Sequence, residues 1–75
     1  MKIYYDKTVD ALYLKISEEK PEGVTEIKEE YNLDLTESGK LVGIEILNAS
    51  KKVDLSSFLT FSIEAEPSVL SEGLG

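Results

Sequence analysis

The sequence predicts a mainly β fold, of the all-β or α+β class: an antiparallel meander of hairpins with about four to six strands and at most one short helix. Two observations predict it. Apolar and polar residues alternate in several short segments, and turn-forming Gly, Pro and charged residues separate these segments. No apolar stretch approaches the roughly 20 residues that a membrane helix needs, so we expect no membrane-spanning helix.

The first predicted hairpin joins residues 2–5 to residues 11–16 through a short polar loop. Leu12, Leu14 and Ile16 alternate with Ala11 and Tyr13, which is the period of a strand with one buried face. Residues 17–23 are charged and contain Pro and Gly, so they form a connection. Residues 24–30 are predicted to form an exposed edge strand, where charged side chains discourage unwanted pairing.

The second predicted hairpin has the clearest pattern, with strands at residues 31–36 and 41–46 around a turn at residues 37–40. Pairing Leu35 with Val42 would place Leu33 opposite Ile44 and Asn32 opposite Glu45, giving one aliphatic and one polar face. The alternation predicts the following buried residues on one side of the sheet: Leu12, Leu14, Ile16, Leu33, Leu35, Val42, Ile44 and Ile46.

The C-terminal third is expected to contain a single helical turn and then a strand. Asp54 is placed to cap a turn in which Leu55, Phe58 and Leu59 share a face. Residues 60–65 then alternate as a strand does. We therefore expect one β-rich domain over residues 1–66 and a loose tail over residues 67–75.

Composition excludes several classes of function. The 75 residues carry a net charge of −7, and there is no Cys, His or Arg, since all 8 basic residues are Lys. Imidazole or thiolate metal sites and Ser-His-Asp triads are therefore excluded. The acidic charge argues against nucleic acid and anionic membranes as partners. We expect a cytoplasmic protein with no cofactor and no metal.

Two motifs resemble a known family. They are Tyr4-Tyr5-Asp6 followed by Asp10-Ala11-Leu12-Tyr13-Leu14, and the segment LVGIEILNAS at residues 41–50. Together they resemble the small prokaryotic proteins catalogued as domain of unknown function 2283, over about residues 1–53. The resemblance implies a small β-rich domain with no established activity and no catalytic residues to carry across. Members of that family are sometimes suggested as partners in toxin–antitoxin-like pairs.

One candidate site is an acidic set: Asp6, Asp10, Asp34 and Glu45. Convergence of these carboxylates would suit a small carboxylate-based or metal-assisted hydrolase. The spacing does not force them together, and Asp6 and Asp10 also suit turns and caps. The sequence favours this second interpretation and assigns no catalytic residue.

The other candidate site is an apolar set on the second face of the sheet: Tyr4, Tyr13, Leu41 and Leu47. Amphipathic aromatic residues on such a face suit a protein interface, although a simple cross-strand pair explains them too. We therefore predict a non-enzymatic protein-interaction module, self-associating or serving as the antitoxin-like partner of a basic protein. A homodimer could form through a sheet edge or the Tyr4/Tyr13 face; folding of residues 54–65 over that face would instead leave a monomer. Gly43 within a strand indicates a bulge, or close approach by another backbone or by a ring such as Tyr13 or Tyr4.

Overall fold

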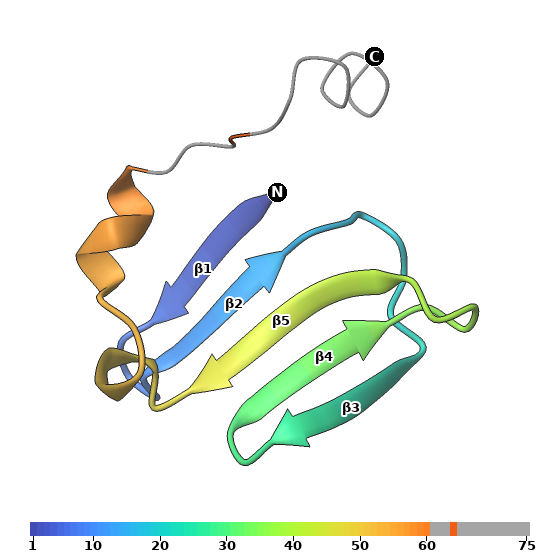
Figure 1. Cartoon of the computed structure of the whole chain (residues 1–75), viewed down its shortest axis with the longest axis horizontal. Helices are drawn as coiled ribbons and strands as arrows, with labels where there is room; N and C mark the ends of the chain where they lie inside the picture. The colour runs from blue at the N-terminus through green and yellow to red at the C-terminus, as the bar shows by residue number, and fades with distance from the viewer. Residues whose placement is uncertain (61–63, 65–75) are drawn as a thin grey trace.

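A computed structural model of the chain describes residues 1–60 and 64. These residues form one five-stranded sheet in which every neighbouring pair is antiparallel (Figure 1). The strands are β1 (Lys2–Asp6), β2 (Ala11–Lys15), β3 (Gly23–Lys28), β4 (Tyr31–Leu35) and β5 (Leu41–Leu47). Two short 3-10 turns follow, η1 (Ala49–Lys51) and η2 (Leu55–Leu59). The predicted fold class is therefore confirmed.

The strand order is β1-β2-β5-β4-β3, which differs from the order of a simple meander. The connection over residues 16–22 carries the chain from β2 to the far edge of the sheet, where β3 lies. Strand β5 then returns to lie between β2 and β4 (Figure 1). Strands β2 to β5 thus form a Greek key. The apolar strand β5 occupies the centre of the sheet, and the charged strand β3 forms an edge in which every residue is exposed. This edge position is the predicted one.

The register of the central hairpin matches the prediction at two of three positions. Leu33 lies opposite Ile44 and Asn32 lies opposite Glu45. The third pairing is wrong, because Leu35 lies opposite Leu41 rather than Val42. The amide of Thr36 donates to the carbonyl of Lys40 at 2.8 Å, so the turn is one residue shorter than predicted. Val42 of β5 is then the extra residue, and it forms a β-bulge opposite Asp34 and Leu35.

The register divides the side chains between two faces. The apolar face consists of Ile3, Tyr5, Leu12, Leu14, Thr25, Tyr31, Leu33, Ile44 and Ile46. The polar face includes one row that crosses all five strands: Tyr4, Tyr13, Glu45, Asn32 and Glu26. The sheet is therefore two-sided, as the alternation predicted.

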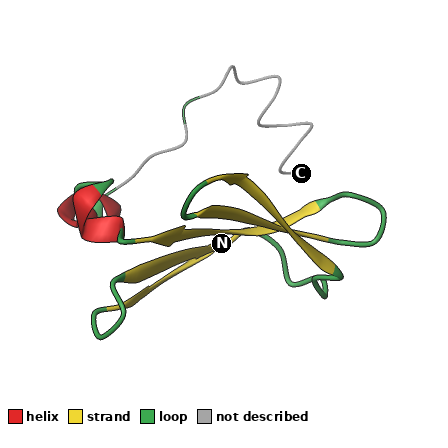
Figure 2. Cartoon of the chain, turned by 90° about the horizontal axis from the view of Figure 1, so that it is seen from below, coloured by secondary structure: helices red, strands yellow, loops and turns green. Residues whose placement is uncertain are grey.

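The core lies at one end of the apolar face. Leu12, Ile46 and Ala49 are buried there, and Val53 and Phe58 from the C-terminal turns pack against them. Asp54 caps η2 as predicted, since its carboxylate accepts from the amide of Ser56 at 3.1 Å. Figure 2 shows the sheet as a single twisted layer with the helical turns at one end.

Burial of the predicted core residues differs from one part of the sheet to another. Leu12, Val42 and Ile46 are buried, Leu14, Leu33, Leu35 and Ile44 are half-buried, and Ile16 is exposed. The prediction of burial is wrong for Ile16 and is met only in part by the four half-buried residues, because the described helical turns cover only the Leu12 and Ile46 end of a one-layer sheet. Most of the predicted strand at residues 60–65 and the predicted tail lie outside the described residues.

Candidate functional site

The first polar cluster is a corner built around Asp10. Its carboxylate accepts hydrogen bonds from the Tyr5 hydroxyl at 2.6 Å, the Ser50 amide at 3.0 Å and the Ser50 hydroxyl at 2.7 Å. The carbonyl of Asp10 also accepts from the amide of Ala49 at 3.0 Å. These bonds tie the β1–β2 loop to the end of β5. They lower the pKa of Asp10, because the Tyr5 and Ser50 donors stabilise the carboxylate, and they raise the pKa of Tyr5.

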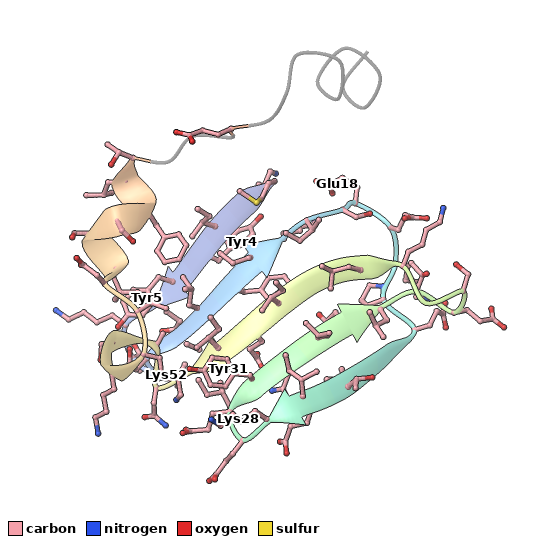
Figure 3. All side chains as sticks on the ribbon, in the orientation of Figure 1. Tyr4, Tyr5, Glu18, Lys28, Tyr31 and Lys52 are labelled. Atoms are coloured by element: carbon pink, nitrogen blue, oxygen red, sulfur yellow. The ribbon has the colours of Figure 1, made fainter. Side chains whose placement is uncertain are left out.

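The second polar cluster lies at the β3–β4 turn. The Glu30 carboxylate accepts from Lys52 Nζ at 3.0 Å and from the side-chain amide of Asn48. Lys52 also donates to the carbonyl of Leu47, and its Nζ lies 5.5 Å from the centre of the Tyr31 ring (Figure 3). Lys52 and Asn48 lower the pKa of Glu30 by stabilising its charge. This cluster holds η1 against the opposite hairpin.

A tyrosine bridge crosses the centre of the polar face. The Tyr13 side chain extends from β2 over Gly43 of β5, and its hydroxyl donates to Asp34 Oδ2 of β4 at 2.7 Å. A Cβ on Gly43 would overlap the end of the Tyr13 ring, so glycine is required by this close approach. The ring predicted to approach Gly43 is thus that of Tyr13. Burial, followed by the hydrogen bond to Asp34, raises the pKa of Tyr13 to about 12.

The acidic set is divided between two places. Asp6 accepts from the amide of Thr8 at 2.9 Å within the β1–β2 turn, and Asp10 belongs to the corner described above. Asp34 and Glu45 lie diagonally on the polar face, where the Glu45 carboxylate accepts from the side-chain Nδ2 of Asn32 at 3.2 Å. Within residues 1–60 and 64, no three acidic side chains are placed to hold a metal ion.

The predicted apolar set is also divided. Tyr4 lies directly opposite Tyr13 and is 50% exposed, so these two form a cross-strand pair at the β1 side of the sheet. Leu41 and Leu47 lie at the two ends of β5, at a separation of roughly 20 Å for a seven-residue strand. Only the tyrosine pair therefore forms a continuous surface.

A feature that the sequence did not reveal is a hollow beside the edge strand β1. Its volume is about 320 Å³, and its lining is almost wholly apolar: Ile3, Tyr5, Leu12, Leu55, Phe58 and Leu59. Leu59 is 85% exposed at its rim. The sequence pattern predicted that Leu55, Phe58 and Leu59 share one face of a helical turn. It did not predict that this face would lie against β1.

These observations define a small, one-layer antiparallel β domain whose motif residues build a corner and an aromatic bridge. The family described as protein of unknown function (DUF2283) matches residues 2–50, and the chain belongs to this family. The resemblance seen in the two sequence motifs is thereby confirmed. No curated protein and no solved structure matches the chain. In residues 1–60 and 64, no helix is long and apolar enough to cross a membrane.

Proposed function

We propose that this domain is a non-enzymatic protein-interaction module. The observation that carries the proposal is the partial cover of the apolar face. Described residues of the C-terminal turns pack over Leu12 and Ile46, whereas Leu33 and Leu35 lie outside that packed cluster and stay half-buried. Apolar surface removed from water on binding stabilises a complex by about 25 cal/mol per Å² before the costs of association.

The surroundings of the carboxylates support an interaction module over the alternative, a hydrolase that uses Asp6, Asp10, Asp34 and Glu45. Asp10 accepts three side-chain or backbone hydrogen bonds, and Asp34 accepts from Tyr13. Groups held in this way position strands and turns. Asp34 and Glu45 do share the polar face, but each is held by a hydrogen bond from a neighbouring side chain, Tyr13 and Asn32 respectively.

The net charge of the chain indicates which class of partner protein it favours. A net charge of −7 favours association with a basic protein, because complementary potentials accelerate encounter. An antitoxin-like role toward a basic neighbour is one form of this function. Self-association is the other.

The test compares two variants at adjacent positions of β4. Leu33→Thr alters the apolar face, and Asn32→Thr alters the polar face with the same introduced residue. Native affinity capture with mass spectrometry, together with light scattering, measures partner binding by each. The proposal predicts a stoichiometric partner, another protein or a second copy, that Leu33→Thr weakens and Asn32→Thr retains.

Circular dichroism confirms that both variants fold. Absence of any stoichiometric partner for the native chain would contradict the proposal. Hydrolytic activity that Asp34→Asn abolishes would favour the alternative.

A further inference from the structure

The two edges of the sheet differ in how well they resist pairing with another chain. The β3 edge carries a β-bulge between Glu26 and Lys28, which interrupts its register. The β1 edge pairs with β2 in continuous register over its whole length, from Lys2 to Asp6. Bulges protect edges and regular edges accept a further strand. Strand β1 forms the more regular of the two edges, and η2 lies beside its C-terminal half (Figure 1).

The residues of β1 are self-complementary in the antiparallel direction. Lys2, Tyr4 and Asp6 point to the polar face, with opposite charges at the two ends. In a twofold pair centred on Tyr4, each Lys2 lies opposite Asp6 of the second copy. We infer that β1 pairs with β1 of a second copy of this chain, so that one antiparallel sheet runs through both. This inference rests on the proposed function and adds a second contact surface to it, since Leu33 of β4 lies three strands away from the β1 edge.

The charges within one copy favour the same arrangement. Lys2 lies opposite Lys15 on the polar face, and like charges in that position are unfavourable. Lys15 is already paired with Glu18 at 2.9 Å. Asp6 of the second copy places a negative charge beside Lys2. Because the pair is twofold symmetric, the dimer contains two such Lys2–Asp6 pairs.

The apolar face adds buried area at the same seam. In this register Ile3 lies opposite Tyr5 of the second copy, and both residues line the hollow beside β1. Leu59, exposed at the rim, lies on the same side. Stable interfaces bury about 1,200–2,000 Å² in total, more than a five-residue strand pair supplies alone. Joining the two hollows supplies further apolar contact.

The test is an exchange of charges, read by light scattering over a range of concentrations. Lys2→Glu and Asp6→Lys each place like charges opposite one another twice, and each is expected to weaken the dimer by roughly tenfold to thirtyfold. An equimolar mixture of the two variants restores two opposite-charge pairs and is expected to restore the dimer. Lys28→Glu on the β3 edge makes the same change in net charge as Lys2→Glu and is expected to leave the dimer intact.

Folding of the variants is checked by cooperative urea unfolding. Because Asp6 accepts from the Thr8 amide, Asp6→Asn serves as a second variant that keeps an acceptor in the turn and removes the charge. It is expected to weaken the dimer less than Asp6→Lys does.

A native chain that stays monomeric at every concentration overturns the inference. So does a dimer that Lys2→Glu leaves unchanged, or a mixture that stays monomeric. In these cases the proposed function still stands if native capture finds a partner that Leu33→Thr weakens. Loss of that partner signal as well would remove both.

Discussion

The substitution Gly43→Ala tests the tyrosine bridge directly. The added methyl group would overlap Oη and Cζ of Tyr13 and lie 2.9 Å from Cε1. Backbone on both sides of Gly43 is fixed by pairing with β2 and β4, so the ring has to move. Moving it removes its packing over β5 and its hydrogen bond to Asp34.

The expected magnitude follows from the parts that are lost. Packing of a half-buried aromatic ring contributes about 1 kcal/mol, which is half or less of the value for full burial. The hydrogen bond to Asp34 contributes about 1 kcal/mol, because its part-buried position reduces the strength usual for a charged acceptor. Replacing Gly by Ala in a strand recovers about 0.5–1 kcal/mol. We therefore expect Gly43→Ala to lower the free energy of unfolding by about 1–1.5 kcal/mol.

Urea unfolding of a double-mutant cycle isolates the contact. In a Tyr13→Ala background the obstacle is gone, so Gly43→Ala should be neutral or stabilise the fold by up to about 1 kcal/mol. Tyr13→Phe should give no such relief, because Cζ and Cε1 of the ring remain in place. An unchanged stability of Gly43→Ala, or the same loss in the Tyr13→Ala background, would refute the bridge as the reason for glycine.

Three further predictions concern the corner, the bridge and the core. Because the pKa of Asp10 is lowered in the folded state, its carboxylate stabilises the fold above the pKa of about 3.9 of an unfolded Asp, and this contribution is lost as the pH falls through the folded pKa. In an acid titration, the free energy of unfolding of Asp10→Asn should therefore depend less on pH than that of the native chain. The raised pKa of Tyr13 should make the free energy of unfolding fall between pH about 10 and about 12, and Tyr13→Phe should lack this step in alkaline titration. In urea, Leu12→Ala should cost about 2–4 kcal/mol because Leu12 is 1% exposed, and Ala49→Val about 1–3 kcal/mol through overpacking.

Local pattern was sufficient to predict the hairpins and their two faces. Alternation placed Leu33 opposite Ile44 and Asn32 opposite Glu45, because a register shift of one residue would exchange the apolar and polar faces. The position of the turn before β5 was also predicted, where Gly39 adopts a φ of 88°, but its length was predicted one residue too long. Each of these features depends on residues that are close in the sequence.

The strand order and the burial depended on distant contacts. Nothing local indicates that β5 pairs with β2, since Leu12 and Ile46 are apolar residues that would suit many partners. The bulge at Leu35 depends on how the turn at Lys40 closes. The half-buried state of Leu33 depends on what covers the face, which alternation does not specify.

The acidic set shows why residue type alone was a poor guide to chemistry. An acid–base group at neutral pH works best with a pKa near the operating pH, which requires a carboxyl pKa raised by burial or by like charge. The donors around Asp10 act in the opposite direction, because three hydrogen bonds to its oxygens stabilise the ionised form. Glu30 is shifted in the same direction by Lys52 and Asn48. Both residues are therefore suited to fixing the strand β5 and the turn η1 in place, because their charged oxygens accept hydrogen bonds from these elements.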